Sequence, residues 1–510
     1  MFHKMKRMRR KLFFTVTVVF FIAVAGLNGQ PEQGLTAVSG VNGQPEQGLT
    51  AVSGVNGRPE QGLAAVSGVN GQPEQGQATV ASDHPHSVSS DEALMTKQWS
   101  LTDCIGYALE QNIQVRKASV NVSVGEINLQ QARDNRWPTL NASFSENLGW
   151  QQETGSGGET SWRGSSRTGA SLSSGLTLFD GFQLRNQVRQ AGLDYRSLQY
   201  SSDQTRESVS LSILSAYLQV LYAEEQVTNS RNQAEATLEE LSLAGERLSL
   251  GAIANSEYLQ VKTQLASEDA TLATALNNLE MARLNLMQLM EYPVDGSFEI
   301  ARPDIDAIIS TAPAADAGSV YEEALQVKPQ VKIAALNRES ASLDLEMARG
   351  GFYPSVSVNA GMSTGFTQAA EMGSQLKSGF SPSVGISASI PIFRNNQNKS
   401  AVSRAQYGIT TAELDELNTR NQLRKEVEQA VLDAGSALIS FQAATNRYEA
   451  SLESYNVSEE KFKLGAMNSV DFLIQKTNLT AAESNLLQAK YELVYSHKII
   501  DFYRGVELSF

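Results

Sequence analysis

Two kinds of hydrophobic pattern alternate along residues 99–510 of this chain. Four runs of about ten residues carry apolar side chains at every second position, as half-exposed β-strands do. The runs follow Trp137-Pro138 and Tyr353-Pro354 as two pairs, and a polar, glycine-rich loop separates the members of each pair. We therefore predict two β-hairpins. The apolar positions are Leu140, Ala142, Phe144, Leu148 and Trp150; Ala170, Leu172, Leu176 and Leu178; Val356, Val358, Ala360, Met362 and Phe366; and Val384, Ile386, Ala388, Ile390 and Ile392.

After each hairpin the pattern changes to the three-to-four spacing of a helix, as at Leu211, Leu214, Leu218 and Leu221. No proline lies between Pro138 and Pro293 or after Pro391. We predict two helices of about 70 residues, each roughly 100 Å long at 1.5 Å per residue. Such a length is typical of a coiled-coil-like assembly. The predicted helices are Gln183 to Leu250 and Asn395 to Leu464, with return helices at about 256–291 and 470–503.

The two halves of this region resemble each other. Leu250-Gly251-Ala252 matches Leu464-Gly465-Ala466, and Lys262-Thr263-Gln264-Leu265 matches Lys476-Thr477-Asn478-Leu479, both at an offset of 214 residues. A short helix opens each half, at 102–111 and 319–326, and a second helix ends near Arg136 or Gly351. Proline disfavours a helical residue before it, so Pro138 and Pro354 end these second helices. We predict a duplicated structural unit.

The N-terminal region has a different character. Six basic residues precede the apolar stretch Leu12 to Val24, which predicts a secretory signal peptide at 1–25, with an uncleaved anchor as the alternative. Removing these six charges changes the formal net charge from −14 to −20. Residues 28–76 carry a 14-residue repeat rich in Gly, Pro, Gln and Ser, so we interpret 26–98 as a flexible tether.

Composition argues against several kinds of function. A strongly acidic chain is a poor ligand for nucleic acid. The single cysteine, Cys104, forms no intrachain disulfide and is expected to be a small buried residue in a helix. His84-Pro85-His86 is expected to be solvated, although a metal contact is the alternative. The sequence has no glycine-rich phosphate loop, no metal-spaced His or Cys cluster and no nucleophile with a base. An enzyme is not predicted, and neither is a cofactor.

The membrane argument depends on counting strands. Beyond the predicted signal there is no apolar run long enough for a membrane helix, so any span must be a closed β-barrel. Four strands are too few, because known barrels have about eight or more. Three chains would supply twelve strands and twelve helices. The fold class expected is mainly α with a membrane β-barrel: long antiparallel helical hairpins in a trimeric α-barrel, with four strands per chain in a shared twelve-stranded barrel.

Residues 99–510 resemble the outer-membrane efflux protein family, the TolC-like outer-membrane factors. The resemblance rests on the duplication, the two helix-to-strand junctions at Pro138 and Pro354, the hairpins and the paired Leu-Gly-Ala tips. It implies repeats at 99–300 and 319–510, with a linker at 301–318. It also implies a homotrimer in the outer membrane of a Gram-negative cell, with its helical tunnel in the periplasm. Such a duct carries substrates for an inner-membrane transporter and docks a periplasmic adaptor, in an efflux pump or a type I secretion system.

The resemblance also points to the hairpin tips. Leu250, Gly251, Ala252, Leu464, Gly465 and Ala466 are the expected adaptor contacts, although simple turn chemistry explains the glycines. Glu257 and Asp471 lie six residues after the tip glycines and are candidates for a charged ring in the entrance. Helix capping and the helix dipole are the competing explanation for these two carboxylates.

The chain departs from the family pattern at several places. Asn112-Ile113 replaces a common Asn-Pro, whereas Lys328-Pro329 keeps the proline. Ile474 stands where some members have a carboxylate, Phe462 where some have tyrosine, and Met467 where some have arginine. We therefore hypothesise that the entrance closes mainly by apolar contact.

Two alternatives remain open at this stage. A periplasmic coiled-coil structural or adaptor protein without a pore would explain the helices but not the four alternating runs. Trp150, Trp162 and Phe366 lie near the outer ends of the hairpins. They fit an interfacial aromatic belt, and ordinary barrel packing explains them equally well.

Overall fold

The computed structural model describes residues 98–154, 156–294, 298–306, 309, 316–367, 374–375 and 378–510. These residues belong to one compact unit, Pro85–Phe510. The predicted signal peptide, the tether up to residue 97, and His84 and His86 lie outside the described residues.

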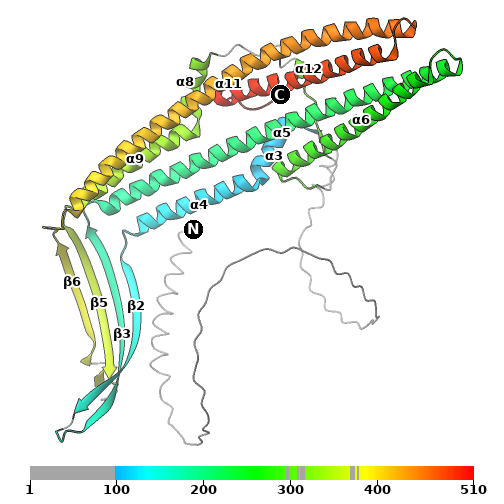
Figure 1. Ribbon diagram of the computed structural model, residues 1–510. Coiled ribbons are helices and arrows are strands. Elements are labelled where there is room, and N and C mark those ends of the chain that lie inside the picture. Colours follow the sequence, from blue (N-terminus) through cyan, green and yellow to red (C-terminus); the bar gives the residue numbers. More distant parts are fainter. Residues whose placement is uncertain are drawn as a thin grey trace, which may run out of the picture. The chain divides into compact units, whose positions relative to one another are not determined.

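The order of helices is the predicted one, and each half repeats it (Figure 1). The first half contains α3 (Leu101–Gln111), α4 (Ile113–Asp134), α5 (Gln183–Ser249) and α6 (Asn255–Met290). The second half contains α8 (Ala317–Val327), α9 (Pro329–Gly350), α11 (Gln397–Lys463) and α12 (Ser469–Arg504). Helices α5 and α11 have 67 residues each, so the long helices predicted from the absence of proline are confirmed. Within the described residues, no helix is both long enough and apolar enough to span a bilayer.

The break between α3 and α4 forms without proline. The Asn112 side chain accepts a hydrogen bond from the Gln114 backbone N–H (2.8 Å) and caps α4. Its Nδ2 donates to the Leu289 carbonyl at 2.8 Å, which fastens the break to the end of α6. In the second half, Pro329 occupies the first position of α9, where a missing N–H costs nothing. Two different residues therefore produce the same break.

The four strands of the two hairpins form one antiparallel sheet in the order β2-β3-β5-β6. Their bounds are β2 (Thr139–Thr154), β3 (Thr160–Phe179), β5 (Ser355–Thr367) and β6 (Ser381–Ser389). The predicted length of about ten residues was too short for the first hairpin, whose strands have 16 and 20 residues. Polar residues 151–154 continue the ladder by pairing with 160–163, because backbone pairing does not require apolar side chains.

One face of this sheet is apolar. Ala142 pairs with Leu172, Leu172 pairs with Met362, and Val358 pairs with Ile386, which places the predicted apolar sets on a common face. On this face, Phe144 of β2 and Val384 of β6 are exposed, whereas Leu172 and Val358 of the two inner strands are half-buried. Glu146 interrupts this apolar face, and its carboxylate accepts hydrogen bonds from Ser166 and Thr168. On the opposite face, the hydroxyl of Ser143 meets that of Ser171, and the hydroxyl of Ser357 meets that of Ser387.

The main core lies around the middle of α5. The two-residue strands β1 (Gln98–Trp99) and β4 (Glu299–Ile300) pair in parallel beside it. The Tyr217 hydroxyl donates to the Ala301 carbonyl at 2.6 Å, which ties this small sheet to α5. Cys104 is fully buried in the same cluster, as predicted. The helices are thus anchored at mid-length, and each hairpin ends in a free tip.

Candidate functional site at the hairpin tips

The two tips have the same backbone geometry. At the end of α5, the Gly251 N–H donates to the Leu248 carbonyl (2.9 Å) and the Ala252 N–H to the Arg247 carbonyl (2.9 Å). At the end of α11, the N–H groups of Gly465 and Ala466 make the corresponding bonds at 3.1 and 2.8 Å. This pair of bonds is the Schellman motif that closes a helix on a left-handed residue.

The tip glycines are required by backbone conformation. Gly251 has φ +69° and Gly465 has φ +74°, a region that side chains with a Cβ rarely adopt. A Cβ at either position would meet no atom within 4 Å, so crowding is not the reason for glycine. The preceding leucines, Leu250 and Leu464, are 82% and 83% exposed. Each hairpin therefore ends in a rigid turn that presents one large apolar side chain to its surroundings.

Arg247 joins the two tips. Its Nη2 donates to the Lys463 carbonyl at 2.8 Å and its Nη1 to the Phe462 carbonyl at 3.5 Å, so one side chain of α5 caps the end of α11. The guanidinium also lies 5.7 Å from the centre of the Phe462 ring. Sequence analysis missed Arg247, although a basic residue in the last turn of a helix is a usable signal for such a cap.

The entrance candidates lie in different surroundings. Phe462 stacks on Phe472 of α12, with ring centres 4.7 Å apart and planes 4° apart. Glu257 is half-buried and lines a small hollow with Arg247 and Phe462. Asp471 is exposed and accepts a 2.7 Å hydrogen bond from the Asn468 amide.

Asp471 takes part in a helix cap. Its backbone N–H donates to the Asn468 side chain at 2.8 Å, at the first turn of α12. This hydrogen bond is the helix capping that sequence analysis gave as the alternative to a charged ring for Asp471. Met467 is half-buried and Ile474 is exposed.

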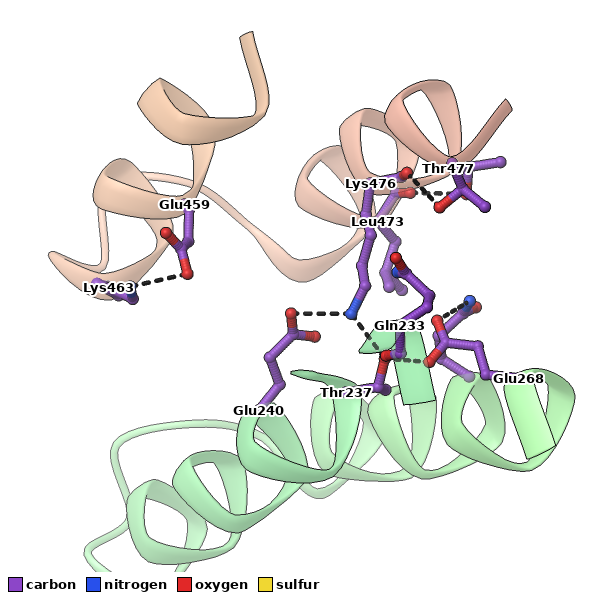
Figure 2. Close-up of polar contacts among 11 residues, drawn as sticks. Gln233, Thr237, Glu240, Glu268, Glu459, Lys463, Leu473, Lys476 and Thr477 are labelled. Carbon is purple, nitrogen blue, oxygen red and sulfur yellow. Dashed lines mark hydrogen bonds and ion pairs between the residues drawn. The ribbon is translucent and has the colours of Figure 1, made fainter. Parts of the chain in front are cut away.

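A buried polar network connects the two hairpins a few turns from the tips. Figure 2 shows Lys476 of α12 pointing toward α5, where its Nζ donates to Thr237 Oγ1 at 2.6 Å and to Glu240 Oε1 at 2.9 Å. The Thr237 hydroxyl contacts the Glu268 carboxylate of α6. Glu268 also accepts a 2.9 Å hydrogen bond from Gln264. Helices α5, α6 and α12 therefore share one polar network, whose lysine is only 3% exposed.

Burial dominates the electrostatics of this network. Desolvation raises the pKa of Glu240, and the nearby Glu268 and Glu459 raise it further, while Lys476 lowers it. Tyr455 of α11 also faces the cluster, and burial together with Glu240 raises the pKa of its hydroxyl. Loss of its acceptors would leave the lysine charge buried without compensation, so the two hairpins are linked by a contact that is costly to break.

Sequence analysis predicted neither the network nor its position. The Lys-Thr-x-Leu match marked Lys476 and Lys262 as equivalent, and both resembled ordinary solvated helix residues. Within the described residues, no group of three or more His, Cys, Asp or Glu side chains is placed to hold a metal ion. The tips combine tight turns, exposed leucines and a guanidinium that caps a helix end.

Long paired helices with exposed tips and a four-stranded sheet with one apolar face define the class: a protein of duplicated helical hairpins that carries a β-sheet. The sequence model of the "Outer membrane efflux protein" family matches residues 104–290 and 320–498. The chain belongs to this family. Membership makes it an outer-membrane protein of the efflux class and favours the exit duct over the coiled coil without a pore.

Individual relatives agree with the family. The chain is 23% identical to the outer membrane protein TolC of Escherichia coli K12 over 74% of this chain and 77% of that protein. It is 24% identical to the outer membrane efflux protein BepC of Brucella suis over 78% and 83%. The open-state crystal structure of the Neisseria gonorrhoeae MtrE outer membrane channel matches with a TM-score of 0.63 and 21% identity, covering 80% of this chain and 88% of that one. The fold is therefore that of the solved outer membrane channels.

Proposed function

We propose that three copies of this chain form one passive exit duct of a tripartite efflux pump or type I secretion system. The observation that carries the proposal is the sheet: one face is apolar, its large side chains on the edge strands β2 and β6 are exposed, and these two edges have no partner within the described residues. Backbone groups at a strand edge must be paired inside a lipid bilayer. Four strands are too few to close on themselves, whereas three copies supply twelve. The apolar face would then contact outer-membrane lipid.

The helices would continue the duct into the periplasm. In this arrangement the repeats at 99–300 and 319–510 supply equivalent parts of the tunnel wall, and the linker at 301–318 joins them. The tips then form the periplasmic entrance, where the exposed Leu250 and Leu464 are suited to apolar contact with a hairpin of a periplasmic adaptor. The adaptor would connect the duct to an inner-membrane transporter. The duct carries out no chemical reaction and needs no cofactor.

The first test is the native mass of the mature protein in detergent, measured by light scattering, together with its conductance in a planar bilayer. A mass of three chains and stepwise conductance are expected. A monomer that stays soluble without detergent would overturn the duct and would favour the periplasmic coiled coil without a pore.

The tips can be tested separately. Replacing Leu250 and Leu464 with Asp should abolish efflux in cells, because a charge would have to be desolvated in an apolar contact. The protein level in the outer membrane and the conductance of the purified duct should stay unchanged, because both side chains are exposed. Normal efflux by the double variant would remove these leucines from the docking site.

We also propose that Glu257 and Asp471 contribute negative charge at the entrance, while Phe462 and Met467 supply its apolar lining. Several carboxylates in one constriction favour cations. Asp471→Asn combined with Glu257→Gln should lower the cation preference measured from reversal potentials in a salt gradient. An unchanged reversal potential would leave Asp471 with its capping role alone.

A further inference from the structure

Each pair of equivalent helices in the internal repeat has one fixed offset, which gives residues of one half counterparts in the other. Helices α5 and α6 (Gln183–Ser249, Asn255–Met290) correspond to α11 and α12 (Gln397–Lys463, Ser469–Arg504) at an offset of 214 residues. Helix α4 (Ile113–Asp134) becomes α9 (Pro329–Gly350) by a shift of 216. A contact between α5 and α9 therefore has an equivalent between α11 and α4.

The contact between α5 and α9 is a closed interface inside the chain. Leu193 of α5 is buried with Leu336 and Leu343 of α9, and Tyr200 packs against them. The helices run antiparallel, since the Gln190 amide donates to Asp344 Oδ1 at 2.9 Å while Lys332 lies over the Tyr200 ring at 5.4 Å. Leu193 thus lies at the level of Leu343, and Tyr200 at the level of Leu336.

The equivalent positions on α11 and α4 are all large, apolar and exposed. Leu193 and Tyr200 correspond to Tyr407 and Leu414, which are 75% and 60% exposed. Leu336 and Leu343 correspond to Val120 and Ile127, which are 61% and 66% exposed. All four positions are therefore apolar, like the residues of the cluster between α5 and α9, but all four are exposed.

These side chains point away from the neighbours that their helices already have. On α11, Glu416 is buried and pairs with Arg338 of α9 at 3.0 Å. It lies two and a half turns beyond Tyr407 at about 3.6 residues per turn, and so on the opposite side of the helix. On α4, Gly125 packs against Leu198 and Tyr195 of α5, roughly half a turn from Val120 and Ile127. The two apolar faces are the outer edges of the layer α4, α5, α9, α11.

We propose that the α4 face formed by Val120 and Ile127 receives the α11 face formed by Tyr407 and Leu414 of a second copy, in the geometry of the internal contact between α5 and α9. The polar neighbours agree: Gln190 and Asp344 correspond to Arg404 and Asn128, a donor and an acceptor without like charges. Because two different surfaces meet, the contact is head-to-tail, and in the proposed trimer three such contacts close a ring. The inference rests on the proposed trimer and adds its contact surface.

The register predicts which residues face each other between copies. Ile127 should lie beside Tyr407, and Val120 beside Leu414. The variant Ile127→Cys with Tyr407→Cys should therefore cross-link with a short bifunctional maleimide in intact outer membranes, giving covalent dimers and trimers on a denaturing gel. The variant Val120→Cys with Tyr407→Cys is the matched control, because Val120 is about 10 Å further along α4. Cys104 is fully buried and stays in every variant.

A charge pair provides an independent measurement. Tyr407→Asp should weaken the trimer by about tenfold or more in its dissociation constant, because a carboxylate would replace an aromatic ring in an apolar contact and would have to be desolvated there. Adding Ile127→Lys should restore most of the loss. Neither side chain is needed for folding of the single chain, since both are exposed in it.

Two results would overturn the contact surface while leaving the duct intact. The first is a native mass of three chains with no more cross-linking of the matched cysteine pair than of the control. The second is cross-linking of copies by Tyr407→Cys alone, since that would require a symmetric contact of α11 with itself. If the native mass is one chain, the proposed duct fails and this interface fails with it.

Discussion

Two equivalent lysines of the duplicated hairpins have opposite environments. Lys476 of α12 is 3% exposed and donates to Thr237 and Glu240 of α5. Lys262, at the same place on α6, is exposed. Both belong to the same Lys-Thr-x-Leu pattern, and both helices have 36 residues. Since the local sequence is alike, the neighbouring helix decides the environment: α12 packs on α5, whereas this face of α6 lies at the edge of the chain.

The positions that supply hydrogen-bond acceptors to Lys476 also differ from their counterparts in the second half. The counterparts of Thr237, Glu240 and Glu268 in the second half are Ser451, Ser454 and Ala482. If copies meet along α6 and α11 as they are proposed to meet along α4 and α11, Lys262 would face hydroxyls and no carboxylate at these positions. We therefore expect the two hairpins of one chain to be held together more firmly than hairpins of adjacent chains near the tips.

The largest expected effect comes from the buried lysine. Lys476→Met should lower the free energy of unfolding by about 4 kcal/mol, because the largely desolvated Glu240 would lose its cation while Glu268 stays buried nearby. Lys262→Met, the matched control, should change it by less than about 0.5 kcal/mol. Urea unfolding of the detergent-solubilised protein, followed by circular dichroism, measures both.

A second variant separates charge from packing in the Lys476 network. If uncompensated charge causes the loss, adding Glu240→Gln and Glu268→Gln to Lys476→Met should recover a large part of the stability. Equal effects of Lys476→Met and Lys262→Met would show that the two junctions do not differ.

The apolar contact between α5 and α9 gives the next largest effect. Leu343 is 2% exposed, and Leu343→Ala should cost about 3 kcal/mol through lost burial and the cavity that remains. Its counterpart Ile127 is exposed in the single chain, so Ile127→Ala should leave chain unfolding nearly unchanged and should instead promote trimer dissociation. Urea unfolding and light scattering at decreasing protein concentration distinguish the two outcomes. A loss of chain stability from Ile127→Ala as large as that from Leu343→Ala would contradict the comparison.

Prediction from sequence succeeded for features that depend on local patterns. The long helices follow from uninterrupted helical spacing, and their ends follow from Gly251 and Gly465. The shared apolar face of the sheet follows from strict alternation. The extension of β2 beyond Trp150 was missed because residues 151–154 are polar, and ladder hydrogen bonds do not depend on side-chain polarity.

Features that depend on the neighbouring helix could not be predicted. Lys476 and Lys262 lie in the same sequence pattern. Leu343 and Ile127 are likewise both apolar helix residues, and the sequence does not show which of them has a packing partner within the chain. Arg247 is an intermediate case: its place in the last turn of α5 suggests a cap, but its actual acceptors, the Phe462 and Lys463 carbonyls, belong to the other hairpin. Pairings across 215 and 216 residues carry no local signal.

The tips allow a smaller test of whether the two hairpins are equivalent. Gly465→Ala and Gly251→Ala should each cost about 1 kcal/mol, because both glycines have positive φ. Gly435→Ala in the interior of α11 is the control and should stabilise by up to about 1 kcal/mol, since a Cβ there meets no atom within 4 Å. In thermal unfolding, the two tip variants should have a lower melting temperature than the parent, and the control should have a higher one. A much larger loss at Gly465 than at Gly251 would show that the tips differ despite their equal geometry.

The smallest effect concerns pH and isolates Glu240. Burial raises the pKa of this carboxyl in the folded chain, so its contribution to stability is fully present below the unfolded pKa of about 4.3 and is lost as pH rises through the folded pKa. Glu240→Gln keeps the shape and an acceptor for Lys476 but does not titrate. The unfolding free energy of the parent minus that of the variant should therefore fall as pH rises from 4 toward 7. Glu207 and Glu483, whose pKa values burial also raises, are present in both proteins, and their contributions cancel. A difference that grows with pH would mean that attraction to Lys476 outweighs burial, and the junction between the hairpins would then be held by its ion pair.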